Sequence, residues 1–93
     1  MVFEWDESKR QRNMHKHGID FVDAIQLWTR FHIETPSDQN CHGEDRFLAI
    51  GEISGRLVTV IFTRRGETRR LISARYSRRN EKENYQNGIG RGS

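Results

Sequence analysis

The stretch RFLAIGEISGRLVTVIFTRRGETRRLISARY, residues 46–76, decides the fold. It contains three runs rich in β-branched and apolar residues: RFLAIGEI (46–53), RLVTVIFTR (56–64) and TRRLISARY (68–76). Ser54-Gly55 separates the first two runs and Arg65-Gly66-Glu67 separates the last two, and short connections of this kind join antiparallel strands. The stretch therefore predicts an antiparallel β-meander.

The residues before the meander predict two helices. Asp6 suits the N-cap of a helix that ends at His17, because Gly18 can adopt the left-handed conformation that stops a helix. This first helix is polar almost all round. Asp20 suits the N-cap of a second helix, whose apolar residues recur at helical spacing and must face a core. These residues are Phe21, Ala24, Ile25 and Trp28.

Shorter elements complete the fold. Residues 2–5 and 31–35 are expected to be strands, and Ser77 suits the N-cap of a short last helix over residues 78–86. We therefore expect an α+β fold in which two N-terminal helices pack on an antiparallel β-meander with a short C-terminal helix. A single domain is expected over residues 1–86, followed by a flexible tail at 87–93.

Charge is divided unevenly along the chain. Residues 1–45 carry five Lys/Arg and nine Asp/Glu, whereas residues 46–93 carry eleven and four. Thirteen of the sixteen basic residues are arginines, whose planar fork matches phosphate oxygens bidentately. Such a concentration of arginine predicts a polyanionic partner, most often nucleic acid.

Alternation along residues 68–76 assigns the arginines of this strand to faces of the sheet. Arg69 and Arg75 point one way, whereas Ile72 and Ala74 point the other. Since Ile72 and Ala74 suit packing on the second helix, we expect Arg69 and Arg75 to line an open basic surface. The structural alternative for Arg75 is an ion pair with an acid such as Glu81.

Several classes of chemistry find no support in the sequence. The four histidines are not accompanied by a carboxylate cluster or a Cys-x-x-Cys at metal-ligand spacing, and no glycine-rich nucleotide cradle occurs. The single cysteine, Cys41, excludes an internal disulfide and suits a reducing cytosol. No apolar run approaches the roughly 20 residues of a membrane span. We therefore expect a cytoplasmic protein that uses no metal or cofactor and does not enter a membrane.

The remaining side chains suit metal-independent cleavage of RNA. RNA supplies its own nucleophile, the 2′-hydroxyl, so a protein needs only to move protons and to stabilise charge on the phosphate. The general base is a His or Glu, with Lys or Tyr as alternatives, and a general acid protonates the leaving 5′ oxygen. A non-catalytic basic module that binds nucleic acid or an acidic protein partner, or a dimeric interaction protein, remains the alternative, because composition does not separate binding from turnover.

Four stretches carry a resemblance to a known family: FEWDESKRQRNMHKHGIDFVDA (3–24), EDRFLAIG (44–51), LISAR (71–75) and SRRNEKENY (77–85). The N-terminal pattern WD-x-x-K…N-x-x-KHG-x-x-F is specific, whereas the Ser-x-Arg and Arg-x-Glu elements are specific only in combination with it. On these residues the chain resembles the BrnT family of type II toxins, small ribonucleases of RelE-like fold. The resemblance implies an endoribonuclease that inhibits growth and translation.

The resemblance also implies where the site lies. It maps the Lys-His-Gly element of the family to residues 16–18, its sheet arginine to Arg75, its helix pair to Arg79 and Glu81, and its closing tyrosine to Tyr85. Where family members often have arginine after the glutamate, this chain has Lys82, which loses the bidentate fork.

From these positions we assign catalytic roles to four residues. Arg75 and Arg64 are expected to stabilise the phosphate, and His17 or Glu81 is expected to act as the base. The structural alternative for His17 is a helix-terminal residue that balances the helix dipole. The residues expected to bind RNA are Lys16, Arg69, Arg78, Arg79 and Tyr85.

The resemblance further implies a partner, a BrnA antitoxin with a ribbon-helix-helix DNA-binding part. Such an antitoxin would neutralise the toxin and let the pair repress its own operon, so that operator DNA is reached only through the antitoxin. We expect an acid-rich antitoxin segment to cover the surface of residues 64–79, because charge complementarity speeds association.

Overall fold

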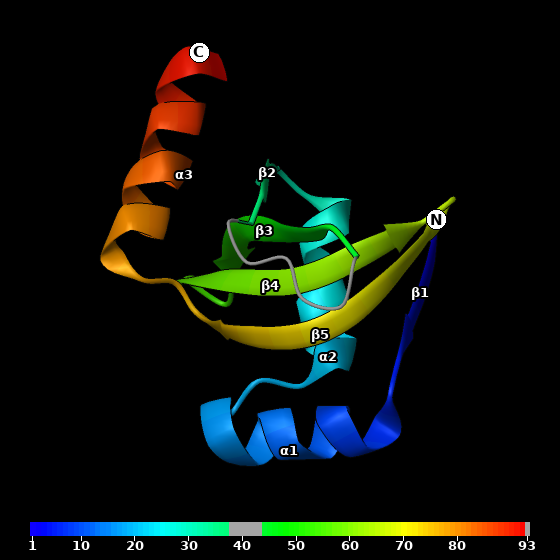
Figure 1. Ribbon diagram of the computed structural model, residues 1–93. Coiled ribbons are helices and arrows are strands. Elements are labelled where there is room, and N and C mark those ends of the chain that lie inside the picture. The colour runs from blue at the N-terminus through cyan, green and yellow to red at the C-terminus, as the bar shows by residue number, and fades with distance from the viewer. Residues whose placement is uncertain (38–43, 93) are drawn as a thin grey trace.

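The structure, a computed structural model, describes residues 1–37 and 44–92, with side chains described as far as residue 88. Its five strands form one sheet in the order β1-β5-β4-β3-β2 (Figure 1). The strands are β1 (Val2–Trp5), β2 (His32–Pro36), β3 (Arg46–Ile53), β4 (Arg56–Arg65) and β5 (Thr68–Tyr76). The predicted meander is confirmed as β3-β4-β5, and β2 adds to it antiparallel to β3. β1, however, pairs with β5 in parallel, so the sheet is mixed.

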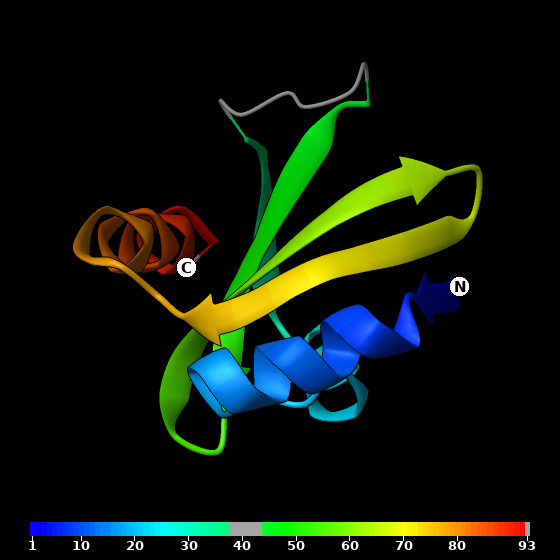
Figure 2. The same ribbon diagram turned by 60° about the horizontal axis from the view of Figure 1, so that its bottom comes forward.

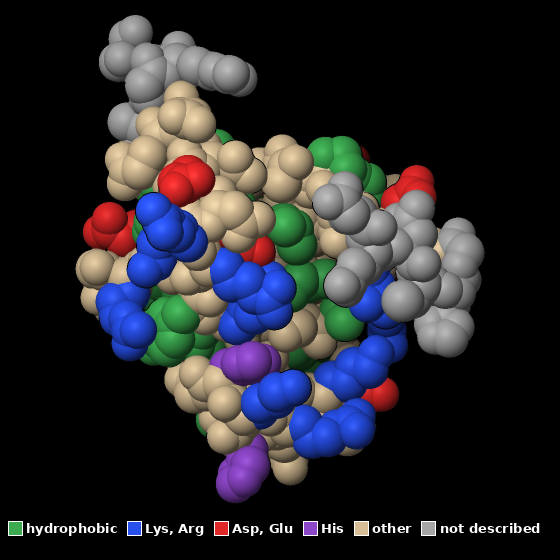
Figure 3. All heavy atoms as spheres, turned by 60° about the vertical axis from the view of Figure 1, so that its left-hand side comes forward, with side chains coloured by type: hydrophobic (Ala, Val, Ile, Leu, Met, Phe, Trp, Pro, Cys, Tyr) green, Lys and Arg blue, Asp and Glu red, His purple; other side chains and the backbone are tan. Residues whose placement is uncertain are grey.

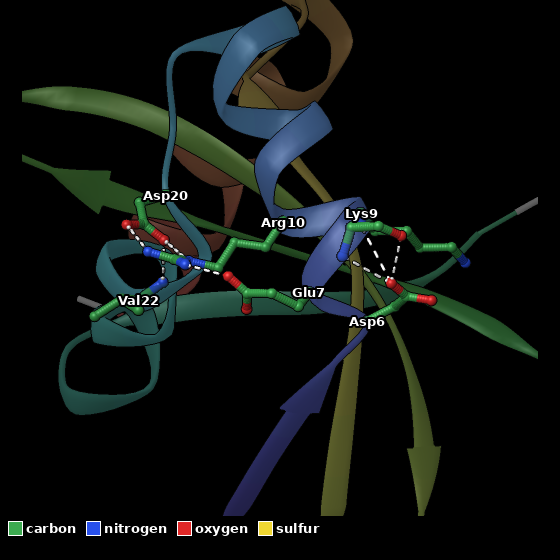
Figure 4. Close-up of polar contacts among 7 residues, drawn as sticks. Asp6, Glu7, Lys9, Arg10, Asp20 and Val22 are labelled. Atoms are coloured by element: carbon green, nitrogen blue, oxygen red, sulfur yellow. Dashed lines mark hydrogen bonds and ion pairs between the residues drawn. The ribbon is translucent and has the colours of Figure 1, made fainter.

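The first helix, α1 (Glu7–His17), has the boundaries that the sequence predicts. The Asp6 carboxylate accepts hydrogen bonds from the backbone N–H groups of Ser8 and Lys9, and Gly18 ends the helix with φ 73°. The Arg10 guanidinium holds both carboxylate oxygens of Asp20 at 2.8 and 2.9 Å, which fastens α1 to the start of the next helix (Figure 4). Asp20 in turn caps that helix by accepting from the N–H of Val22 at 3.0 Å.

The other two predicted helices differ from expectation in length. The second is an α-helix of only four residues, α2 (Phe21–Ala24), that continues as the 3-10 helix η1 (Ile25–Thr29). The last helix, α3, extends over Arg79–Gly92 rather than ending at residue 86. Ser77 was expected to cap α3, but its hydroxyl hydrogen-bonds the Thr59 hydroxyl at 2.9 Å instead.

The core lies between α2–η1 and one face of the sheet. Phe21, Ala24 and Leu27 are fully buried there, as the helical spacing predicts for the first two. They pack against a buried cluster from the sheet: Ala49, Val58, Val60, Phe62, Leu71 and Ala74. The ring of Trp28 lies 5.1 Å from that of Phe3 and 5.2 Å from that of Phe62, which closes the cluster towards β1.

A register shift in β5 changes which of its residues share a face. Ile61 pairs with Ser73 whereas Phe62 pairs with Leu71, so Ile72 is the extra residue of a β-bulge. As a result Leu71 and Ala74 both face the core, although simple alternation separates them. The prediction that Arg69 and Arg75 share a face is therefore wrong: the bulge puts them on opposite sides of the sheet.

Helix α3 packs on the opposite face of the sheet, near β2 and β3. The Tyr85 ring lies 5.6 Å from the Phe31 ring in an edge-to-face contact. A Cβ on Gly88 would come within 2.7 Å of the Ile33 side chain, so this glycine permits a close approach to β2. Figure 2 shows α1 along β5 and α3 beyond the end of that strand.

Candidate active site and nucleic-acid interface

Arg75, near the end of β5, and Glu81, in the first turn of α3, form a paired fork. Arg75 Nη1 lies 2.7 Å from Glu81 Oε1, and Arg75 Nη2 lies 2.8 Å from Oε2. The side chains are only 15% and 5% exposed. Glu81 Oε1 also accepts from the Thr59 hydroxyl at 3.1 Å and from the Arg78 N–H at 2.7 Å. These four contacts fix the Arg75 guanidinium with respect to both β5 and α3.

The same contacts set the protonation of Glu81. Burial acts to raise the pKa of its carboxyl group, but the hydrogen bonds from Arg75 and from the Arg78 backbone outweigh burial, and the pKa is lowered. A carboxylate that is hydrogen-bonded to several donors and has a depressed pKa is a weak acceptor for a further proton. These contacts suit a role of Glu81 in positioning Arg75 better than a role as the base.

Asn13 of α1 ties this helix to β5 beside Arg75. β1 pairs with β5 only as far as Leu71, so the next part of that edge has no strand neighbour. The Asn13 amide fills the place: it donates to the Ala74 carbonyl at 2.9 Å and accepts from the Ala74 N–H at 3.0 Å. It also donates to the Ile19 carbonyl at 2.9 Å and accepts from the Ser73 hydroxyl at 3.2 Å. The last turn of α1 is thereby held next to Arg75.

A cleft of about 350 Å³ lies between α1 and β5. Its cations come from successive turns of one face of α1, and its other side is β5 at the bulge. The lining residues are Lys9, Arg12, Asn13, Lys16, His17, Ile72 and Ser73. In the face shown by Figure 3, blue Lys and Arg side chains lie on both sides of a purple histidine. This arrangement suits a phosphate-bearing chain.

His17 is the titratable group of this cleft. Burial lowers the pKa of its imidazole, and the positive charges of Lys16 and Arg75 lower it further. A lowered pKa keeps the imidazole neutral near pH 7, which is the form that accepts a proton. The charge of Arg75 therefore acts on His17 in the same direction as burial and Lys16.

The other two sheet arginines expected at the site lie elsewhere. Arg64 is on the core-side face of β4, where it pairs with Glu34 at 2.6 Å and stacks 4.1 Å over the Phe47 ring. Arg69 donates to the Gly66 carbonyl at 3.2 Å, in the turn between β4 and β5. The structure brings neither of them to Arg75. Their expected roles stay predictions.

Arg78, which precedes α3, and the expected RNA-binding residues of that helix differ in accessibility. Arg78 is exposed next to the Arg75–Glu81 pair, and the Arg79 side chain is 95% exposed with only a 3.5 Å ion pair to Glu83. Tyr85 is 8% exposed and packs on Phe31, so stacking on a base would require it to leave this contact. The two arginine side chains are therefore exposed, whereas the Tyr85 ring is held in a packing contact.

Several residues that shape the site escaped the sequence reasoning. Lys9 and Arg12 were not assigned to it, although their spacing with Lys16 on one helix face could have indicated them. Asn13 gave no such signal, because its partner Ala74 is distant in the sequence.

Two further findings concern metals and membranes. Among residues 1–37 and 44–92, no group of three or more His, Cys, Asp and Glu side chains is arranged to hold a metal ion. Cys41, on which the expectation of no internal disulfide and a reducing cytosol depends, lies outside the described residues. Within the described part of the chain, no helix is both long and apolar enough to span a bilayer.

The chain is similar to known proteins in both sequence and structure. A family model described as the ribonuclease toxin BrnT of type II toxin–antitoxin systems matches residues 5–81. The structure is similar to the crystal structure of the Brucella abortus ribonuclease toxin, BrnT, with a TM-score of 0.67 and 34% sequence identity between the two chains. The match covers 85% of this chain and 100% of that chain. No curated protein sequence matches. The chain therefore belongs to the BrnT family of ribonuclease toxins of type II toxin–antitoxin systems.

Proposed function

We propose that this protein is a metal-independent endoribonuclease toxin, with Arg75 and His17 at its reaction centre. The observation that carries the proposal is a cationic cleft lined by His17, next in space to a β5 residue, Arg75, whose guanidinium is held by two hydrogen bonds and contributes to lowering the pKa of His17. Family membership supports ribonuclease activity in general. The geometry supports the specific route.

In this route His17 removes the proton from the 2′-hydroxyl of RNA. The 2′ oxygen attacks the adjacent phosphorus, the bond from phosphorus to the 5′ oxygen breaks, and that oxygen takes a proton from water in the open cleft. The products are a 2′,3′-cyclic phosphate and a 5′-hydroxyl. Arg75 stabilises the extra negative charge on the phosphoryl oxygens, since a preorganised donor pays no reorganisation at the moment of reaction.

The α1 cations hold the RNA strand that leads to this centre. Lys9, Arg12 and Lys16 line one cleft, so they can contact successive phosphates without reading bases. Arg78 and Arg79 extend the positive charge on the other side of Arg75. Glu81 and Asn13 act as positioning residues, because each fixes the backbone or side chain that presents the reacting groups.

The test is incubation of the purified protein with single-stranded RNA in excess EDTA. Cleavage is expected to persist and to leave 2′,3′-cyclic phosphate and 5′-hydroxyl ends, whereas a 2′-O-methyl RNA stays intact. His17→Ala and Arg75→Gln are expected to lose cleavage by on the order of 100-fold or more. Arg65→Gln is the matched control, because Arg65 pairs with Glu44 away from the cleft. Loss of cleavage in EDTA that returns with a divalent metal ion would overturn metal independence.

We propose that an antitoxin of the BrnA type silences the toxin by covering the basic face around Lys16, Arg75 and Arg78. Opposite charge favours an acidic antitoxin segment there and predicts that association slows steeply with salt. Hydrogen exchange on the complex should show protection of α1 and of the start of α3. Protection confined to β2 would contradict this placement.

A further inference from the structure

Strand β5 ends one residue after Arg75 in a partly exposed aromatic side chain. Tyr76 is 40% exposed, and the Arg56 guanidinium carbon, from the start of β4, lies 3.5 Å from the centre of its ring. Arg56 is itself exposed, and within the described part of the chain no carboxylate pairs with it. The two planar groups form a stack at the surface that the proposed reaction does not use.

Two hollows of about 270 Å³ each meet at this stack. The residues that line the first hollow include the apolar Val58 and the polar Asp23 and Gln26. The second includes Lys82. Arg56 and Tyr76 line both hollows. A planar heterocycle with hydrogen-bonding edges matches the first hollow, and an anion matches the second.

The stack is connected to the proposed reaction centre through the chain, because Tyr76 directly follows Arg75. Arg75 and Tyr76 are successive strand residues, so their side chains leave β5 on opposite sides. On α1, His17 lines the cationic cleft whereas its neighbour Gly18 lines the first hollow. His17 and Gly18 are successive residues, so the cationic cleft and the first hollow both border the end of α1.

We propose that Tyr76 and Arg56 form a base-binding subsite for the nucleotide that adjoins the scissile phosphate. Its base stacks on this pair in the first hollow, with its edge towards Asp23 and Gln26. Lys82 holds a phosphate of the same nucleotide in the second hollow. Aromatic and guanidinium planes accept bases of any sequence by stacking, and the polar groups at the hollow give selectivity. The subsite rests on the proposed ribonuclease function.

Binding of oligonucleotides that lack the 2′-hydroxyl tests the subsite without turnover. Fluorescence anisotropy compares a single-stranded DNA oligomer with an abasic oligomer of the same length and charge. Tyr76→Ala is expected to weaken binding of the DNA on the order of 10-fold and to leave the abasic affinity unchanged. Tyr76→Phe, which keeps the ring, is expected to bind both as the unaltered protein does. Equal losses for both oligomers, or none for either, would overturn the subsite.

Lys82→Gln separates the phosphate contact from the base contact. It is expected to weaken the DNA and the abasic oligomer by the same factor and to reduce the salt dependence of both. A loss specific to the base-containing oligomer would contradict the role given to Lys82. Thermal unfolding of each variant establishes that the fold is intact.

Cleavage assays keep the two proposals apart. If the protein cleaves RNA, Tyr76→Ala should raise KM and flatten the sequence preference more than it lowers kcat. If no RNA is cleaved but Tyr76→Ala still loses base-dependent binding, the nuclease proposal fails and the subsite stands. If Tyr76→Ala cleaves RNA with an unchanged KM and an unchanged sequence preference, the subsite proposal fails and the nuclease proposal stands.

Discussion

The Arg75 guanidinium and the Glu81 carboxylate face each other through two parallel hydrogen bonds of 2.7 and 2.8 Å. This pair connects the end of β5 to the first turn of α3, and it is largely buried. A buried charge loses its compensation when its partner alone is removed, whereas removal of both charges leaves none. The stability of variants can therefore separate the structural role of the pair from the chemical role of Arg75.

We expect Glu81→Gln to destabilise the protein by about 3 kcal/mol, because Arg75 then remains buried without a carboxylate. The double variant Arg75→Met with Glu81→Gln should recover at least about 1 kcal/mol of this loss, because it no longer buries an unpaired guanidinium. In both variants the glutamine oxygen can still accept from the Arg78 N–H. Urea unfolding measures both values. RNA cleavage should stay absent in the double variant, and activity there would show that Arg75 is not required.

Acid should destabilise the native protein partly through Glu81. Burial raises the pKa of this carboxyl group, but the bonds from Arg75 and Arg78 lower it more, so the folded-state pKa lies below its ordinary value of 4.5. The resulting stabilisation is complete above that ordinary value and is lost as the pH falls through the folded-state pKa.

Urea midpoints measured between pH 7 and pH 3 check this linkage. Glu81→Gln should show a shallower decline below pH 4.5 than the unaltered protein. Glu83→Gln is a suitable control, because Glu83 is exposed and makes only a 3.5 Å ion pair with Arg79. Parallel curves for all three proteins would contradict the assignment.

His17 should titrate below its ordinary value of 6.5, because burial and the charges of Lys16 and Arg75 disfavour the imidazolium form. NMR titration of the ring protons measures this pKa without any assay of activity. Arg75→Gln and Lys16→Gln should each raise the pKa of His17 towards 6.5. If His17 is the base, kcat/KM should fall on the acid side with the same pKa. An inflection that persists in His17→Ala would assign the base elsewhere.

The Asn13 amide should contribute strongly to stability. Asn13→Ala removes four hydrogen bonds and leaves the N–H and C=O of Ala74 without their partner, at a cost of about 2 kcal/mol or more. Asn84→Ala, at an exposed position of α3, is the matched control and should be close to neutral. Denaturant unfolding of the two variants compares them directly. Equal stabilities would show that the edge of β5 does not depend on Asn13.

Local signals in the sequence predict most elements of this fold. Asp6 and Gly18 bound α1 as expected, since a cap acts within its own turn. The meander follows from its turn residues, which also act locally. By contrast, the parallel pairing of Val2–Trp5 with β5 joins segments more than 60 residues apart. No local pattern specifies such a pairing.

The site was predicted less completely, for a physical reason that Ile72 illustrates. Alternation holds only while a strand stays in register, and the bulge at Ile72 reverses it between Leu71 and Ala74. Arg75 and Glu81 were foreseen as a possible pair, because they are close in sequence. Arg69 was placed with Arg75 by counting residues, and the extra residue of the bulge moved it to the other face.

Arg64 and Arg75 provide the sharpest comparison, because both were expected to stabilise the phosphate. Thr59 pairs with Arg75 across β4 and β5, and side chains alternate along β4, so Arg64 lies on the side opposite to Arg75. We expect Arg75→Gln to lose cleavage by on the order of 100-fold. Arg64→Gln should change kcat/KM by less than about 3-fold, because its contacts are with Glu34 and Phe47. Steady-state cleavage of one RNA by both variants measures the difference. A comparable loss in Arg64→Gln would contradict the assignment of phosphate stabilisation to Arg75 alone among the arginines of β4 and β5.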